Sequence, residues 1–338
     1  MSVGLDIGTK TIKVVELTKQ GDTRSLRASG IVGHKGITPD LSKNDKELVT
    51  VAEAIKKLYK DAKISSKDVS IALPEAQVFT RTIKFPLLTD SEIASAVKWE
   101  AEQYIPIPVN EAIIQHQIVE RREDTTPPQV VTLLVAAPKI LVEKYAKVVE
   151  MAGLNLVAVE TELMALIRSL APADQTSLLV DFGARSTDIA ISKNGILVFS
   201  RSITTAGEAF TRAVAQALGV DEAQAEEYKR TYGLSGTQLE GKIKQALYPV
   251  FQMVSDEMKK AIHFYQSEEK GNSPTSVLMA GGTAGMPEAA SALTKLLGIE
   301  VIVGNPFAKV SVDPQAVSAL AGYAPFYSVA VGLAMRDD

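Results

Sequence analysis

Apolar and polar positions along the first half of the chain alternate in two ways that predict strands mixed with helices. Period-two alternation and turn residues predict a β-rich opening to about Val32 and further strands at 68–73, 78–85, 112–119, 129–137 and 154–159. Helical spacing predicts helices at 90–104, 139–152 and 160–170, and one that places Leu48, Val51, Ile55 and Leu58 on one face. This alternation of strand and helix is typical of an α/β protein.

The second half repeats this order. Strands are predicted at 178–183, 187–192, 196–200, 276–279 and 300–303. Helices are predicted at 207–219, 221–232, 287–297 and from about Ser328. A long amphipathic helix carries apolar residues from Ile243 to Tyr265, and Pro249 within it predicts a kink or a break.

Each half also contains a strand that ends in Asp-x-Gly, followed by small residues and a second strand. The residues are Asp6, Gly8, Thr9 and Lys10 in the first half, and Asp181, Gly183, Ala184, Arg185 and Ser186 in the second. Glycine permits a tight turn with exposed backbone amides. Each Asp alone is also typical of a turn residue that caps its own hairpin. Two such hairpins facing each other would hold a polyphosphate from both sides, with the two carboxylates near its Mg²⁺.

Composition narrows the functional classes. A chain of 338 residues predicts two or more cores with a cleft between them. A net charge of −4 without a basic block disfavours nucleic acid as a partner. The absence of cysteine excludes disulfides and thiol nucleophiles, and three scattered histidines disfavour a zinc site or a Ser-His-Asp hydrolase.

Sequence features also bear on location. The N-terminus lacks the pattern of a signal peptide, and the longest apolar run, near 130–137, is far shorter than the roughly 20 residues of a membrane span. We therefore expect a cytoplasmic protein that reaches a membrane only indirectly.

Three further features each have two interpretations. Gly281, Gly282 and Thr283 form either a structural turn or a place where the backbone approaches a flat ring or a ribose. Glu226, Lys229 and Arg230 share one helix face, which is either solvated or bonded to ribose and base. Trp99, the only tryptophan, either packs on a neighbouring lobe or lines a groove for a partner peptide.

The glycine turns, taken in order, resemble the phosphate-1, phosphate-2 and adenosine motifs of the actin-like ATPase superfamily. Segments 157–160 and 328–334 resemble its two connecting helices. An insert at 86–153 resembles the subdomain found in FtsA and PilM, and segments 97–108 and 225–233 resemble the PilM family of type IV pilus assembly proteins.

This resemblance implies an actin-like α/β fold with two similar lobes around a nucleotide cleft and an FtsA/PilM-type inserted subdomain. The implied parts are a first lobe (1–85, 154–175 and 320–338), the inserted subdomain (86–153), a second-lobe core (176–205 and 275–319) and a helical subdomain of the second lobe (206–274).

The resemblance also implies a site. ATP would lie between the lobes, Asp6 and Asp181 would hold Mg²⁺ through water, and Lys10 would be within reach of the phosphates. Glu226, Lys229, Arg230 and the Gly281 turn would contact adenosine. Glu160 takes the place where actins carry the residue that positions the attacking water, as a base or as a structural group. We therefore expect at most a slow ATPase.

The implied partner is the N-terminal cytoplasmic tail of a PilN-like inner-membrane protein. It would be held in a groove between the first lobe and the insert, near Trp99 and Tyr104, and would recruit the chain to the inner membrane. Further implied partners are the pilus motor ATPases or a platform protein, and the chain could also associate with itself. Segment 332–338 is too acidic and too short for an FtsA-type membrane helix, and the transmembrane segment of fused secretion-system relatives is missing. The alternatives are an FtsA-like cell-division or cytoskeletal protein, and an actin-fold ATPase or kinase with a small-molecule substrate.

Overall fold

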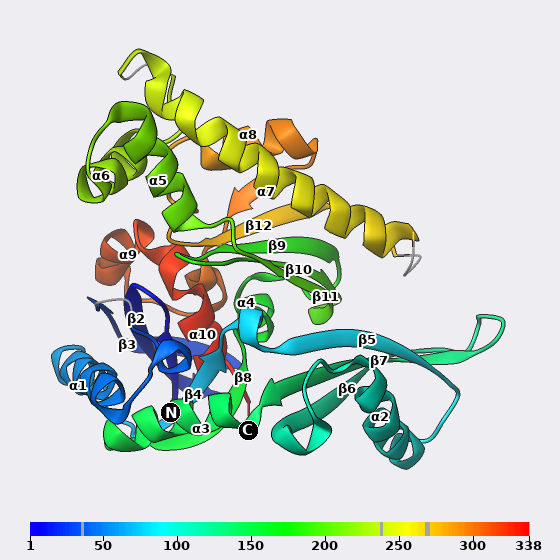
Figure 1. The fold of residues 1–338 in the computed structure, drawn as a ribbon. Helices are drawn as coiled ribbons and strands as arrows, with labels where there is room; N and C mark the ends of the chain where they lie inside the picture. Colours follow the sequence, from blue (N-terminus) through cyan, green and yellow to red (C-terminus); the bar gives the residue numbers. More distant parts are fainter. Residues whose placement is uncertain (35–36, 237–238, 268–270, 338) are drawn as a thin grey trace.

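Two five-stranded sheets organise the molecule (Figure 1), whose computed structural model describes residues 1–34, 37–236, 239–267 and 271–337. In the first lobe, the antiparallel strands are β1 (Ser2–Ile7), β2 (Thr11–Gln20) and β3 (Thr23–Gly33). Two more strands, β4 (Asp68–Leu73) and β8 (Asn155–Thr161), extend this sheet in parallel from β1. The order is therefore β3-β2-β1-β4-β8.

The second lobe repeats this topology strand for strand. Its antiparallel strands are β9 (Thr176–Phe182), β10 (Thr187–Lys193) and β11 (Ile196–Ile203). The parallel strands are β12 (Ser276–Gly281) and β13 (Val301–Val303), which gives the order β11-β10-β9-β12-β13. Because the two topologies match, the β1–β2 and β9–β10 hairpins occupy equivalent positions in their lobes.

Helices cover both faces of the first sheet. The helices α1 (Asp45–Asp61) and α3 (Lys139–Met151) pack on one face through a shared core that includes Ile55 and Tyr145. The Asn44 side chain accepts a hydrogen bond of 3.2 Å from the Glu47 amide and caps the start of α1. On the other face lies α10 (Ser328–Ala334), every residue of which is buried.

The second sheet is covered in the same way. The helices α5 (Gly207–Leu218), α7 (Lys242–Ser267) and α8 (Ala289–Leu297) pack on one face around Phe182, Phe210 and Phe251. The helix α6 (Glu222–Tyr232) lies against α5, and α4 (Glu162–Leu170) packs on the opposite face of the sheet. Pro249 lies within α7, which continues through it as one helix, so the break left open by the sequence does not occur.

The helices α4 and α10 cross between the lobes at Gly332. A Cβ atom on Gly332 would lie 1.9 Å from the carbonyl oxygen of Ala165, so only glycine allows this approach. The expectation that residues 157–160 form the first connecting helix is wrong, because those residues lie in strand β8. The helix begins after it, capped by the Thr161 side chain, which accepts a hydrogen bond of 3.3 Å from Met164 N.

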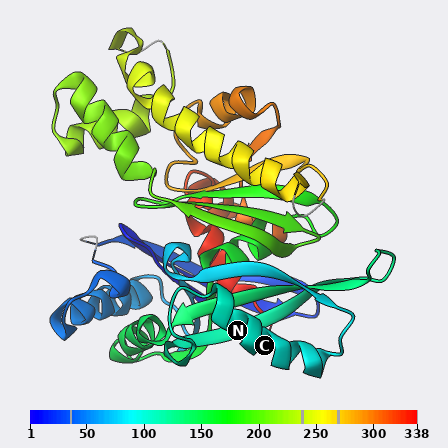
Figure 2. The same ribbon diagram turned by 45° about the vertical axis from the view of Figure 1, so that its right-hand side comes forward.

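A third, smaller sheet projects from the first lobe (Figure 2). It contains β5 (Phe79–Pro86), β7 (Gln129–Pro138) and β6 (Ala112–Arg122), and α2 (Asp90–Tyr104) packs on one of its faces. We call residues 79–138 the insert. The expected limits of 86–153 differ at both ends, because β5 pairs with β7 along its whole length and α3 packs in the first-lobe core. The division into four parts otherwise stays a prediction.

Near the C-terminus, α9 (Pro314–Ala321) is a short helix without buried residues. Among the described residues, no single helix is long and apolar enough to cross a membrane. Segments 314–321 and 324–334 meet that test only as a pair bent by 96°.

Candidate functional site

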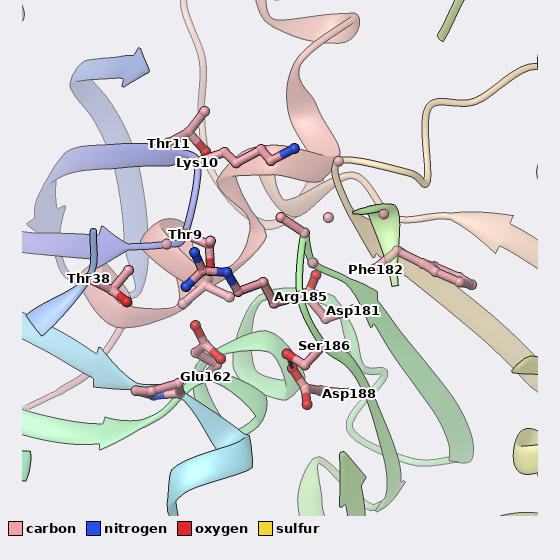
Figure 3. A pocket seen from close by; sticks show the side chains of 18 of the residues that line it. Thr9, Lys10, Thr11, Thr38, Glu162, Asp181, Phe182, Arg185, Ser186 and Asp188 are labelled. Carbon is pink, nitrogen blue, oxygen red and sulfur yellow. Dashed lines mark hydrogen bonds between the residues drawn. The ribbon is translucent and has the colours of Figure 1, made fainter. Parts of the chain in front are cut away.

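A cavity of about 570 Å³ lies between the two lobes, and both hairpins open onto it (Figure 3). All the residues that the sequence analysis assigned to nucleotide or metal line this cavity. They are Asp6, Gly8, Thr9, Lys10, Asp181, Gly183, Ala184, Arg185, Ser186, Glu226, Lys229, Arg230, Gly281, Gly282 and Thr283. The tertiary structure therefore brings together segments that are up to 277 residues apart in the sequence.

In the first hairpin, Asp6 pairs across the strands with Lys13. The Lys13 Nζ atom donates a hydrogen bond of 2.9 Å to Asp6 Oδ2, and both side chains are almost buried. The turn is closed by a bond of 3.1 Å from the Gly8 amide to the carbonyl of Thr11. The His34 Nε2 atom lies 2.5 Å from the Gly8 carbonyl oxygen, so a neutral His34 with a proton on Nε2 donates to it.

The second hairpin has the same register, but Asp188 takes the place that Lys13 has in the first. A Cβ atom on Gly183 would lie 2.8 Å from the carbonyl oxygen of Ser186, which explains the glycine in this turn. Ser186 Oγ donates a hydrogen bond of 2.9 Å to Asp188 Oδ2. The first amides of α5 donate to the turn carbonyls, Gly207 N to Gly183 O at 3.0 Å and Glu208 N to Ala184 O at 2.9 Å.

Negative charge accumulates where the two hairpins face each other. Burial raises the pKa of Asp181 to about 7, with Asp188 and Asp6 adding to the shift. Burial also raises the pKa of Asp188 to about 6, with a contribution from Glu75, although hydrogen bonds from Ser202 and Ser186 oppose it. A cation placed here would stabilise the ionised carboxylates.

The donor set fits a hydrated Mg²⁺ ion. The cavity offers carboxylate oxygens, which are the ligands that this ion prefers, and Asp188 Oδ1 is buried without a hydrogen-bond partner within the described part of the chain. In the same part of the chain, no group of three acidic or histidine side chains is arranged to hold a metal directly. Coordination through water, with Asp6 and Asp181 as the carboxylates, is compatible with both observations.

Besides Glu226, a glutamate that the sequence analysis did not select, Glu162, faces this cavity. It lies in the first turn of α4, lines the cavity and accepts a hydrogen bond of 3.3 Å from the Glu75 amide (Figure 3). Burial, followed by the charges of Asp188, Asp6 and Asp181, raises the pKa of Glu162 well above its usual value.

The predicted Glu160 is wrong in position. Its carboxylate accepts hydrogen bonds of 2.6 and 2.7 Å from Arg168 and lies 3.4 Å from Arg336, in a second hollow. If the strand continued through residue 162, Glu160 and Glu162 would point to the same face, because residues two positions apart along a strand share a face. The strand ends at Thr161 and the helix starts at Glu162, so the two carboxylates point in different directions and only Glu162 turns to the cavity.

All three charged residues of this α6 face line the cavity, but only Lys229 is buried, while Glu226 is half-buried and Arg230 is exposed. Lys229 is only 5% exposed, and its Nζ atom donates to Glu226 Oε2 at 2.6 Å and to Thr211 Oγ1 at 3.0 Å. Burial lowers the pKa of Lys229, and the contact with Glu226 opposes that shift.

The glycine turn that follows β12 lines the same cavity. Gly281 has a φ of +82°, and a Cβ atom there would lie 2.3 Å from Asp181 Oδ1, so the turn requires glycine. The next helix, α8, begins at Ala289, close to the predicted start at 287.

The two aromatic residues predicted for a partner groove, Trp99 and Tyr104, line neither this cavity nor the second hollow, among the residues that the structure describes. Trp99 is 74% exposed on α2, so it is not packed on a neighbouring lobe. The Tyr104 ring lies 4.0 Å beneath the guanidinium of Arg81, within the insert.

This second hollow has a volume of about 920 Å³ and separates the insert from the first lobe. We call it the groove. Its walls include β6 and β8, and each is the last strand of its sheet. Ile113 on β6 is 39% exposed and Val157 on β8 is 56% exposed, and Val157 lies at a β-bulge in the pairing with β4. Outer edges of strands offer unpaired backbone groups to an added segment.

Sequence reasoning missed Lys13, Asp188 and Glu162. The first two had a signal, because counting outward from each turn, one residue at a time on both strands, places them directly opposite Asp6 and Asp181. Glu162 had none, since Glu160 is equally acidic and only two residues away.

Comparisons with known proteins agree with this architecture. The sequence profile of the family described as type IV pilus assembly protein PilM matches residues 4–338. A solved structure of a PilM-PilN type IV pilus biogenesis complex matches with a TM-score of 0.85 and 29% identity, and the match covers 99% of this chain and 98% of that one. Cell division protein FtsA of Pseudomonas aeruginosa is 26% identical, over 99% of this chain and 88% of FtsA. An MreB protein of Spiroplasma citri bound to AMPPNP shares the fold, with a TM-score of 0.58 and 15% identity over 98% of this chain and 93% of that one.

Proposed function

Because this chain belongs to the family of type IV pilus assembly protein PilM, we propose that it is an ATP-binding scaffold of pilus assembly. In this proposal, ATP with Mg²⁺ occupies the cavity between the lobes, and the N-terminal tail of a PilN-like inner-membrane protein occupies the groove. The tail holds the chain at the cytoplasmic side of the inner membrane and links it to the pilus motor ATPases or the platform protein. Self-association remains a further part of this hypothesis.

The observation that carries nucleotide binding is the pair of equivalent hairpins with Asp6 and Asp181 facing one cavity. Turns of this type present backbone amides to phosphate oxygens, and Lys10 and Arg185 add positive charge at the cavity. Bound Mg²⁺ would neutralise the phosphates, and Asp6 and Asp181 would orient its water ligands. The pair of half-buried Glu226 and buried Lys229 offers hydrogen-bonding groups for ribose and base.

Glu162 takes the role first given to Glu160, because Glu162 lines the cavity and Glu160 lies in the second hollow. Its pKa is raised by burial and by the charges of Asp188, Asp6 and Asp181, and bound Mg²⁺ would offset the effect of those charges. Binding ATP requires the two turns and the ion, whereas hydrolysis also requires an oriented attacking water. We therefore expect ATP to be bound much more effectively than it is hydrolysed.

Peptide binding is supported by the shape of the groove and by the PilM-PilN relative. The edge strands β6 and β8 line the groove, and Ile113 and Val157 supply apolar surface between them. An extended peptide can pair with such an edge while its alternate side chains enter the hollow. Trp99 and Tyr104 have no part in this arrangement.

Two binding measurements test the proposal. Calorimetry should detect Mg²⁺-ATP binding that Asp181→Asn abolishes and that the exposed variant Asp45→Asn leaves unchanged. A fluorescent synthetic peptide of a PilN-like N-terminal tail should bind the protein, lose affinity in Val157→Glu and keep it in Trp99→Ala. The nucleotide part is refuted if ATP does not bind, and the partner part is refuted if Val157→Glu leaves peptide affinity unchanged.

A further inference from the structure

The insert is part of the first lobe by chain connection, but the groove separates much of it from that lobe. The chain enters the insert after Pro74 through a single 3₁₀ turn, Glu75–Gln77, and leaves it at Pro138, where α3 begins. Near these two connections, Val78 and Ala137 join the first-lobe core. Farther out, β6 and β8 are held apart by the groove of about 920 Å³.

A hydrogen bond of 2.7 Å from Lys139 Nζ on α3 to the Asn110 carbonyl joins the insert to the first lobe, and further polar contacts join it to the second lobe. The Thr82 Oγ1 atom on β5 donates a hydrogen bond of 2.8 Å to the carbonyl of Val198 on β11. The Lys193 Nζ atom on β10 donates to the two carboxylate oxygens of Glu120 on β6 at 2.9 and 3.0 Å. Both side chains of this ion pair are half-buried, and Arg122 adds a third hydrogen bond of 2.8 Å to Glu120.

Apolar packing reinforces these contacts. Leu133 on β7 is fully buried in a cluster with Leu179, Ala190 and Leu197 of the second lobe, and Val119 packs against the same cluster. In Figure 1, β5 runs directly beneath β11, and Figure 2 shows the insert against the same sheet. The sheet of the insert therefore has α2 on one face and the second lobe on the other.

We propose that the insert moves with the second lobe, so that closure of the lobes on a nucleotide changes the width of the groove between β6 and β8. The inference rests on the proposed function, because it takes the nucleotide as the ligand that closes the cavity and the groove as the peptide site. The insert pivots at its two connections to the first lobe, near Pro74 and Pro138. The ion pair of Glu120 with Lys193 transmits the motion.

The physical consequence is a coupling between the two sites. A nucleotide that favours one relative position of the lobes also favours one width of the groove, and only peptides that fit this width gain affinity. Linkage is reciprocal, so a bound peptide changes nucleotide affinity by the same factor, expected to be about fivefold or more.

The absence of cysteine allows a direct distance measurement. Spin labels on Ile113→Cys and Val157→Cys span the groove, and labels on Ile113→Cys and Met253→Cys join the insert to the second lobe. Double electron–electron resonance is recorded without nucleotide and with saturating AMPPNP and Mg²⁺. We expect the distance between 113 and 157 to shift with AMPPNP and the distance between 113 and 253 to stay constant.

Two variants test the role of the ion pair. In Lys193→Gln, the shift between 113 and 157 should become smaller, or part of the molecules should keep the nucleotide-free distance. The control is Lys147→Gln, which removes an ion pair of 2.8 Å between α3 and α1, inside the first lobe. It should behave like the parent protein, and circular dichroism checks that both variants are folded.

Each other result overturns the inference. If AMPPNP binds and the distance between 113 and 253 shifts while that between 113 and 157 is constant, the insert moves with the first lobe. If neither distance shifts although calorimetry shows binding, closure does not reach the groove. If calorimetry shows no AMPPNP binding, the proposed function fails first and this inference fails with it.

Discussion

Replacing Asp181 by asparagine should raise the stability of the nucleotide-free protein at neutral and basic pH while abolishing nucleotide binding. Asp181 opens onto the cavity next to Asp6 and Asp188, and burial with these charges raises its pKa to about 7. Asparagine has the same shape but carries no charge, so it removes the repulsion without leaving a hole.

The size of the effect follows from the shift in pKa. A rise from 3.8 to about 7 corresponds to at most about 4 kcal/mol of unfavourable free energy for the ionised form. The folded protein binds more protons than the unfolded chain between these two values. The free energy of unfolding therefore falls as the pH rises from about 4 to about 7, because the folded protein must give up the extra proton. Above pH 7 the ionised Asp181 carries its full unfavourable free energy in the folded state.

The assay is urea unfolding followed by far-ultraviolet circular dichroism, at pH 5 and pH 8, in buffer with EDTA and without nucleotide. We expect Asp181→Asn to exceed the parent protein by a few kcal/mol at pH 8 and by much less at pH 5. Asp45→Asn, a change at an exposed carboxylate, should differ by less than about 0.5 kcal/mol at either pH. If Asp181→Asn is less stable at pH 8, or if its advantage does not depend on pH, the electrostatic reasoning is wrong.

Three further expectations concern stability and are all measured by urea unfolding. Gly332→Ala should lower the free energy of unfolding by about 3 kcal/mol, because the crossing of α4 and α10 has no room for a Cβ atom. Gly322→Ala is the control and should change it by less than about 1 kcal/mol, because Gly322 has open space around it and a φ of −70°. Equal effects of the two variants would contradict the close approach of the helices at Gly332. At pH 8, Glu160→Gln should destabilise the protein by about 1–3 kcal/mol, because the ion pairs with arginine are lost. Glu162→Gln should stabilise the protein, because it removes a carboxyl whose pKa is raised. The reverse order would indicate that Glu160, as first predicted, is the glutamate that faces the cavity. Trp99→Ala should cost less than about 0.5 kcal/mol, and Trp99 emission should be quenched by iodide as for an exposed side chain; a protected Trp99 would show that it is covered in solution.

The sequence predicted the local elements well because their signals lie within single segments. The helix at 90–104 and the strand at 68–73 have the bounds that the periodicity indicated. The resemblance to the PilM family and the two-lobed actin-like fold are also confirmed. The three glycine turns indicated this family and fold, because the geometry of each turn leaves little room for a side chain at its glycine.

The limits of the insert could not be read in the same way. The strand at 78–85 is visible in the sequence, but nothing local indicates that it pairs with β7 rather than with the first-lobe sheet. In the same way, α3 follows the insert without a break in the sequence pattern, yet its apolar face packs on α1 and β8. Strand partners and helix contacts are non-local, so composition and periodicity leave them open.

The sequence by itself determined two Asp-x-Gly hairpins, a glycine turn and the alternation of strands with helices, since each depends on the conformational preferences of neighbouring residues. Only the tertiary structure decided which carboxylates share the cavity. It selected Glu162 over Glu160 by ending β8 at Thr161, and it brought the pairs Asp6–Lys13 and Asp181–Asp188 of the two hairpins to one cavity. It also decided that the insert contacts the second lobe through Glu120 and Lys193. Burial and charge interactions depend on distances through space, and those distances exist only once the chain has folded.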